Sequence, residues 1–140
     1  MKAHLTRRYW FSASHRLHND EMSEQENRNT YGKCNNPYGH GHNYALEVTV
    51  AGHVDPATGM VCNIVDLDGF VSREILDRFG HENLNTLEEF RACVPTTENL
   101  CTSIFGILKR GFSAAHLEKV RLEETMMNSF EYAGDAEPLK

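Results

Sequence analysis

The sequence predicts an α+β fold in which two helices cover a four-stranded antiparallel sheet, in the order ββααββ. Alternating apolar and polar residues indicate strands before residue 55 and after residue 118. Between residues 66 and 111, apolar residues recur instead at helical spacing. No linker, repeat or low-complexity tract interrupts the 140 residues, so we expect a single domain over 1–140, with a core at about 6–133 and a loose tail at 134–140.

The first half of the chain predicts two strands separated by a polar region. Thr6–Ser14 contains Tyr, Trp and Phe and is rich in residues that favour strands. Residues 18–29 are dense in Glu and Asn, which predicts a loop or a frayed helix, and residues 31–43 form a Gly- and Asn-rich loop. In Tyr44–Val54 apolar and polar residues alternate, as in a half-buried strand, and residues 55–59 have the composition of a turn.

The middle of the chain predicts two helices. Apolar residues over Asp66–Phe79 share one helical face, with the first residue of this range as the expected N-cap and Gly80 as the stop. A second helix is expected to start at Thr96 or Thr97, either of which can cap it, and to end at Gly111.

The last two strands are Lys119–Thr125 and Asn128–Tyr132, and the short gap between them predicts a hairpin. A sheet built from two hairpins has exposed edges, which association into a ring would pair. We therefore expect a homo-oligomer.

Composition excludes several functions. A formal charge of −6 leaves no basic stripe for phosphates, so we expect no nucleic-acid partner. No apolar run approaches the roughly 18–20 residues that cross a bilayer, and the charged N-terminus lacks the apolar segment of a secretory signal. We expect a cytoplasmic protein with no membrane partner. A reducing cytosol argues against disulfides, and Cys62 and Cys101 lie in apolar surroundings typical of buried thiols.

An H-x-H pair is the main chemical motif. In extended chain His40 and His42 point to the same side, so both can bind one metal ion. His15, at the end of the first strand, offers a third imidazole. Three imidazoles with one open position are typical of a catalytic zinc rather than a structural one. Cys34 lies in the polar loop and is a candidate base or nucleophile.

Six motifs, in this order, resemble the 6-pyruvoyl-tetrahydropterin synthase family over about residues 9–132. The matching segments are F-S-A-S-H-R-L at 11–17, G-K-C-N-N-P-Y-G-H-G-H-N-Y at 32–44, V-D-P through G-M-V at 54–61, H-E-N-L-N at 81–85, T-T-E-N at 96–99 and E-E-T at 123–125. The spacing from Cys34 to H-G-H, with a third histidine upstream, is specific.

The resemblance implies a fold, an activity and a set of residues. The family adopts the tunnelling fold, in which ββααββ subunits form trimers and pairs of trimers with sites at subunit interfaces, so a homohexamer is expected. Its members are zinc-dependent carbon–oxygen lyases that remove triphosphate from 7,8-dihydroneopterin triphosphate, giving 6-pyruvoyl-tetrahydropterin in tetrahydrobiopterin biosynthesis. The matching positions are His15, His40 and His42 as zinc ligands, Cys34 as the catalytic thiol, His81 as the relay histidine, Glu124 as the pterin anchor, and Thr96 and Thr97 in a pocket-lining segment.

These residue types suit that reaction. Zinc would polarise the side-chain carbon that loses a proton, and a thiolate could take the proton. Imidazole titrates near neutral pH, as a relay requires, and a carboxylate suits the parallel N–H donors of a pterin. A one-residue register slip would place Glu123 rather than Glu124 in the pocket. Candidates for holding the triphosphate are Arg16, Arg28 and Lys33.

One position departs from the family pattern. Family members carry an aspartate directly before the relay histidine, where this chain has Gly80. An orienting carboxylate can be worth orders of magnitude in rate. Two alternatives to the pyruvoyl enzyme therefore stay open: a 6-carboxytetrahydropterin synthase of the queuosine pathway, and a non-catalytic binder of zinc and pterin. The carboxy type usually has a shorter gap between the cysteine and H-G-H, so the longer gap here favours the pyruvoyl enzyme.

Overall fold

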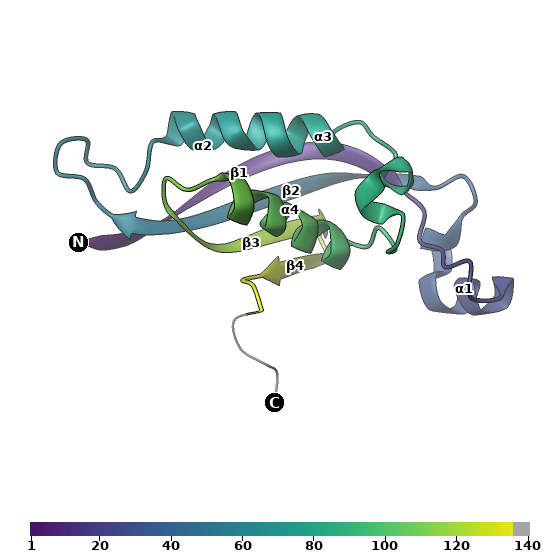
Figure 1. Cartoon of the computed structure of the whole chain (residues 1–140). Helices are drawn as coiled ribbons and strands as arrows, with labels where there is room; N and C mark the ends of the chain where they lie inside the picture. The colour runs from purple at the N-terminus through teal and green to yellow at the C-terminus, as the bar shows by residue number, and fades with distance from the viewer. Residues whose placement is uncertain (136–140) are drawn as a thin grey trace.

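The computed structural model describes residues 1–135, so most of the tail expected at 134–140 lies outside the described residues. One sheet holds four antiparallel strands in the order β1-β2-β3-β4 (Figure 1). The strands are Lys2–His15 (β1), His40–His53 (β2), His116–Thr125 (β3) and Asn128–Tyr132 (β4). The predicted α+β class and the order ββααββ are confirmed, with one short helix added between the first two strands.

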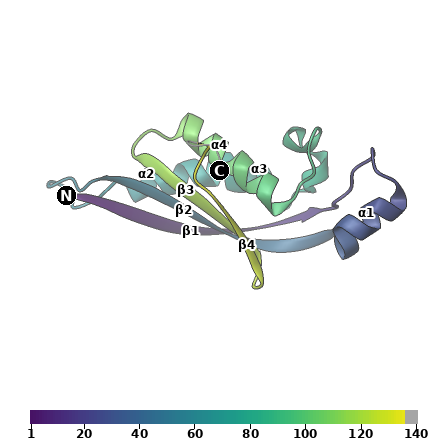
Figure 2. The same ribbon diagram turned by 90° about the horizontal axis from the view of Figure 1, so that it is seen from below.

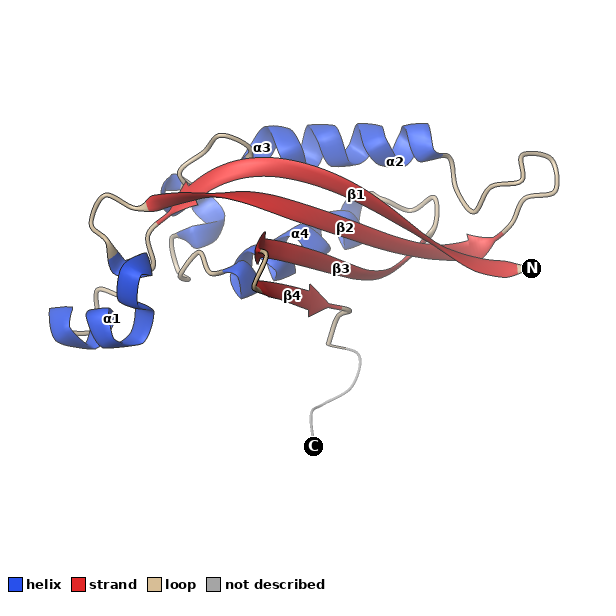
Figure 3. Ribbon diagram, turned by 180° about the vertical axis from the view of Figure 1, so that it is seen from behind, coloured by secondary structure: helices blue, strands red, loops and turns tan. Residues whose placement is uncertain are grey.

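The helices cover one face of the sheet. Ile64–Val71 (α2), a π-helical turn at Ser72–Leu76 and Asp77–Phe79 (α3) run as one rod along the sheet, and Thr97–Gly111 (α4) packs against β3 and β4. Figure 2 shows these helices on one side of the sheet and none of them on the other. Figure 3 shows that α1 (Glu24–Tyr31) lies apart from them, beyond the C-terminal end of β1 and the N-terminal end of β2.

Strand alternation creates the core between the sheet and the helices. Tyr44, Leu46 and Val48 of β2 are fully buried at every second position, and they belong to the same hydrophobic core as Leu100 and Ile104 on the apolar face of α4. Cys62 and Cys101 are buried as predicted. Within residues 1–135, no helix has the length and apolar character to cross a membrane.

The two long strands extend beyond their predicted bounds. β2 begins at His40 rather than Tyr44 because its first residues pair with the end of β1, where His40 lies opposite His15. The H-G-H motif is therefore part of a strand rather than a loop. At the other end of the pair, β1 begins at Lys2 rather than Thr6, since Lys2 lies opposite His53.

Two helices also start where side-chain capping places them. The Asn63 side chain accepts a hydrogen bond from the Val65 amide at 2.9 Å, so α2 starts at Ile64 and not at the predicted cap, Asp66. In the polar segment predicted as loop or frayed helix, Ser23 and Glu26 form a reciprocal capping box, which defines the start of α1.

A charged contact ties β1 to α2. Arg7 donates through Nε and Nη2 to the two Asp68 carboxylate oxygens at 3.0 and 2.8 Å, and the Tyr9 hydroxyl donates to Oδ1 at 2.8 Å. The Arg7 guanidinium, and to a lesser degree Tyr9, holds the pKa of Asp68 below its ordinary value of 3.8, against a smaller opposing effect of burial.

We expect Asp68→Asn to lower the melting temperature near neutral pH and to lose this effect in acid. A carboxylate with a lowered pKa in the folded state stabilises that state above its unfolded pKa, and the stabilisation is lost as the pH falls through the folded pKa. The gap between wild type and variant should therefore be full at pH 6 and shrink below about pH 4. Thermal denaturation across this range measures it. Asp77→Asn, at an exposed position on α3, is the control, and a gap independent of pH would contradict this account.

Candidate metal and ligand site

Three histidines meet on the helix-covered face of the sheet, at the end of the β1–β2 pair. His15 continues the buried alternation of Phe11 and Ala13 on β1, and His40 and His42 share the strand face of Tyr44 on β2. Because His15 lies opposite His40 in the register, the three rings come together without any distortion of the sheet.

The three rings form a compact cluster. Their ligand nitrogens all lie within 4.8 Å of one another, and His15 Nε2 is 3.2 Å from His40 Nε2. Ring centroids are 4.7–4.9 Å apart and each pair of rings is close to perpendicular, at 80–89°. Two ligands of a tetrahedral zinc at about 2.1 Å would lie about 3.4 Å apart. The spacing of the cluster is therefore close to that of a three-histidine metal site.

The chemistry of the cluster also fits a metal ion. Burial lowers the pKa of His15 and of His42, which favours the neutral imidazoles that metals bind. His15 Nδ1 lies 2.8 Å from the Pro95 carbonyl, and this contact leaves Nε2 for the centre of the cluster. His42 Nε2 is buried without a well-aligned hydrogen bond, although Glu124 Oε1 lies 3.1 Å away. A metal ion would give this buried nitrogen a partner, because the His42 ring lies beside the rings of His15 and His40.

Local backbone contacts hold the cluster in place. Gly39 has φ +74°, and a Cβ there would lie 3.0 Å from the His15 carbonyl oxygen, so glycine permits the close approach of the two strands before H-G-H. The Leu17 amide donates to the Cys34 carbonyl at 2.8 Å, and the buried Asn35 side chain donates to the Leu17 carbonyl at 2.7 Å. These bonds fix the cysteine segment beside the end of β1.

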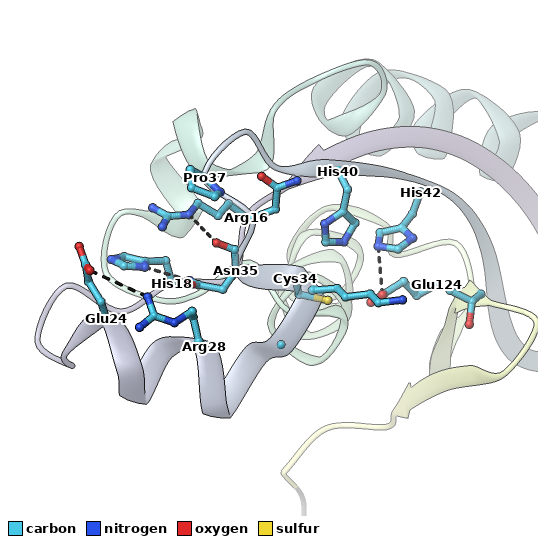
Figure 4. A pocket seen from close by; sticks show the side chains of 14 residues that line it. Arg16, His18, Glu24, Arg28, Cys34, Asn35, Pro37, His40, His42 and Glu124 are labelled. Carbon is cyan, nitrogen blue, oxygen red and sulfur yellow. Dashed lines mark hydrogen bonds and ion pairs between the residues drawn. The ribbon is translucent and has the colours of Figure 1, made fainter.

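Cys34 lies in a 3-10 turn at Gly32–Asn35 and lines a cavity of about 960 Å³ together with His40, His42 and Glu124 (Figure 4). Its side chain is partly buried. Burial, and to a lesser degree the Glu124 carboxylate, raises the pKa of the Cys34 thiol. A thiolate at this position therefore needs additional positive charge nearby, which a bound metal would provide.

Glu124, and not Glu123, faces the cavity. Its carboxylate lies 3.1 Å from His42 Nε2 and accepts a hydrogen bond from the Thr97 hydroxyl. The strand pairing is irregular here, because Glu123 lies opposite Ser129 and Thr125 opposite Asn128, which leaves Glu124 as an extra, unpaired residue. Such a bulge changes the direction of a side chain, and here Glu124 rather than Glu123 lines the cavity.

The two threonines have different roles. The Thr96 side chain accepts from the Asn99 amide at 3.1 Å and caps α4, whereas Thr97 is buried and contacts Glu124. Neither of the two threonines expected in a pocket-lining segment is among the residues that line the cavity. Only Thr97 is connected to it, through the hydrogen bond to the Glu124 carboxylate.

His81 does not line this cavity. It lines a smaller hollow of about 240 Å³ with Ser12, Ser14 and His42. Its amide donates to the Ser12 carbonyl at 2.6 Å, which holds the residue against the edge of β1 at a left-handed φ of +60°. No carboxylate is among the described residues that line the hollow.

The backbone at Gly80, where the family pattern has an aspartate, leaves no room for a side chain. Gly80 closes the last turn of the α2–α3 rod by donating to the Leu76 carbonyl at 2.8 Å. A Cβ at Gly80 would lie 2.5 Å from that carbonyl oxygen, so any other residue requires the main chain to shift.

Two asparagines escaped the sequence reasoning. Asn35 binds the Leu17 carbonyl, as described above, and Asn85 forms two bonds with the main chain of Arg16, at 2.7 and 2.8 Å. Buried or bridging amides leave no periodic signal in a sequence.

All three cations named as triphosphate candidates, Arg16, Arg28 and Lys33, line the cavity.

Fold and site together define a tunnelling-fold protein with a cavity built around a histidine cluster suited to a metal. The model of the family described as 6-pyruvoyl tetrahydropterin synthase matches residues 4–135, and the chain belongs to this family.

Individual proteins of known name are also similar to this chain in sequence and structure. The chain is 44% identical to the 6-pyruvoyl tetrahydrobiopterin synthase of Homo sapiens over 135 residues, covering 96% of this chain and 93% of that protein. It resembles the structure of Caenorhabditis elegans 6-pyruvoyl tetrahydropterin synthase with a TM-score of 0.91 and 42% identity, covering 96% and 97% of the two chains. A putative 6-carboxy-5,6,7,8-tetrahydropterin synthase of Archaeoglobus fulgidus is 36% identical over 85 residues, covering 61% of this chain and 67% of that protein.

Proposed function

We propose that this chain is a lyase that eliminates triphosphate from 7,8-dihydroneopterin triphosphate and yields 6-pyruvoyl-tetrahydropterin, in tetrahydrobiopterin-type biosynthesis. The observation that carries the proposal is one cavity lined by His40, His42, Cys34 and Glu124. The similarity to proteins named for this reaction runs over nearly the whole chain and supports the same function.

His15, His40 and His42 would hold a zinc ion, in keeping with their spacing and with the lowered pKa values of His15 and His42. When bound, zinc supplies a Lewis acid that polarises the hydroxyl-bearing side chain of the substrate. The protein keeps the ligands in register through β1 and β2 and orients His15 through the Pro95 carbonyl.

Cys34 is the proposed base. Its thiolate takes a proton from a side-chain carbon, the carbon–oxygen bond to the triphosphate breaks, and the leaving group takes the bonding electrons. The oxidation of the side chain and the reduction of the ring balance within the substrate, so no external redox cofactor is needed. The position of Cys34 on the cavity wall with His40 and His42 supports this role.

Glu124 is the proposed anchor of the pterin ring, with Thr97 holding its carboxylate. We expect Glu124→Gln to raise KM about tenfold to a hundredfold, since a hydrogen bond to a charged group is lost. Steady-state kinetics measure this. Glu123→Gln is the matched control, because the Glu123 carboxylate is adjacent in sequence but lies 3.7 Å from Arg121 and does not line the cavity. A larger effect of the control would contradict the assignment.

His81 is the proposed proton relay, contributed to the cavity of Cys34 by a second copy of the chain. Two points support this proposal: His81 lies in a separate hollow on the edge of β1, and the family resemblance implies sites at subunit interfaces. A hexamer built from two trimers would supply such neighbours and would pair the free edges of the sheet.

A mixture of two inactive variants tests this arrangement. Cys34→Ala and His81→Ala should each be inactive alone, and co-assembly should restore about a quarter of wild-type activity, because a quarter of the sites then combine both intact residues. Activity is measured after co-expression with two affinity tags. Absence of any recovery in verified mixed oligomers would place both residues in one subunit.

The rival product is a 6-carboxytetrahydropterin, kept open by Gly80 and by the shorter match to the Archaeoglobus protein. Release of inorganic triphosphate by the zinc-loaded protein tests the elimination common to both readings. No release together with tight pterin binding would favour a non-catalytic binder.

A further inference from the structure

The cavity has two chemically different ends. In Figure 4, Glu124 and His42 lie at one end, Arg16 and Arg28 lie at the other, and Cys34 lies between them. The arginine end is unusual in a chain whose formal charge is −6. Local positive charge in an acidic protein points to a ligand that carries negative charge.

Neither arginine is neutralised by a close acidic partner. Arg28 lies 3.9 Å from Glu24, whose side chain is 91% exposed, and such a pair is weak. Arg16 has no carboxylate within 4.0 Å among residues 1–135. Arg28 also donates through Nη2 to the Gln25 side-chain oxygen at 3.1 Å. The positive charge of both guanidinium groups, and their remaining N–H donors, are therefore available to a ligand.

The half-buried Arg16 is held ready for binding. Asn85 binds its main chain on both sides, accepting from the amide at 2.7 Å and donating to the carbonyl at 2.8 Å. The Arg16 Nε group donates to the Asn35 carbonyl at 3.3 Å. These contacts use the main chain and Nε, so the two terminal nitrogens stay free for a planar, bidentate acceptor.

We infer that Arg16 and Arg28 form an anion subsite that holds the triphosphate of the substrate. This inference rests on the proposed function. With the pterin at Glu124 and the reacting carbons at Cys34, the triphosphate at the far end of the substrate side chain extends toward the arginine end. Arginine forks match phosphate oxygens in geometry and charge, so this end selects the phosphorylated pterin over the free alcohol.

Binding measurements on the zinc-loaded protein test the subsite. The measurements use a Cys34→Ala background, which slows turnover. Arg28→Ala should weaken the binding of dihydroneopterin triphosphate about fivefold, and the double variant Arg16→Ala/Arg28→Ala should weaken it about a hundredfold. Binding of dihydroneopterin, which lacks phosphate, should change less than about twofold. Arg73→Ala, which removes an exposed arginine remote from the cavity, is the matched control, and Arg28→Lys should recover part of the loss.

Inorganic triphosphate separates this inference from the proposed function. Inorganic triphosphate is also titrated into arginine variants that keep Cys34. If these variants bind it more weakly than the wild type does, but the wild type forms no pterin product, the subsite stands and the proposed function fails. If product forms but the arginine variants bind the substrate as tightly as Arg73→Ala, the subsite is wrong and the function stands. Equal weakening of dihydroneopterin and its triphosphate also overturns the subsite, because the arginines would then act on the ring or on the fold.

Discussion

His42→Ala is expected to release the metal and to abolish turnover. His42 Nε2 is buried among two other imidazoles and has no aligned hydrogen bond, so its loss removes one of three ligands. Loss of groups that only support a ligand costs about 10–100-fold in metal affinity, and loss of the ligand itself should cost more than about 100-fold. Turnover should fall about a thousandfold or more, because a Lewis acid contributes several kcal/mol to the transition state.

Metal content by mass spectrometry and turnover on one sample measure both effects. His116→Ala is the matched control, since that side chain is 63% exposed on β3, outside the cluster. Removal of the metal from the wild type by a chelator should reproduce the loss of activity, and zinc should restore it. Full activity of the metal-free wild type would contradict the role proposed for the three histidines.

Cys34→Ala is expected to lower kcat by about 10²–10⁴-fold, the usual contribution of a positioned acid or base. Metal content and pterin binding should stay near the wild-type values, because the histidine cluster and Glu124 are untouched. Cys93→Ala is the matched control, since Cys93 is an exposed thiol that does not line this cavity. A variant that loses zinc together with activity would instead identify Cys34 as a metal ligand.

Local sequence patterns predicted most of the fold. Period-two and helical spacing located the strands and the two core helices, because burial on one face imposes that spacing directly. Strand ends were less predictable, since β2 reaches His40 only through pairing with His15. Pairing between residues so far apart in sequence leaves no trace in either segment alone. The cap at Asn63 was missed because Asp66 has the same capping chemistry within the same turn.

In the candidate site, too, local patterns were predictable from the sequence and long-range pairing was not. The three histidines were predicted together because H-x-H and strand alternation fix their direction. The family resemblance favoured Glu124, but strand alternation alone left Glu123 open, because an unpaired residue in the β3–β4 pairing decides which carboxylate faces the cavity. Sequence also could not place His81, which the Ser12 carbonyl holds in a hollow separate from that of Cys34.

The product of the reaction tests the central claim most directly. Purified, zinc-loaded protein is incubated with 7,8-dihydroneopterin triphosphate, and the pterin products are identified by mass spectrometry, with Cys34→Ala in parallel. We predict a 6-pyruvoyl-tetrahydropterin that the variant forms at least about a hundredfold more slowly, and this result would show that Gly80 is compatible with catalysis. A 6-carboxytetrahydropterin as the main product, or no turnover by the wild type, would contradict the proposed function.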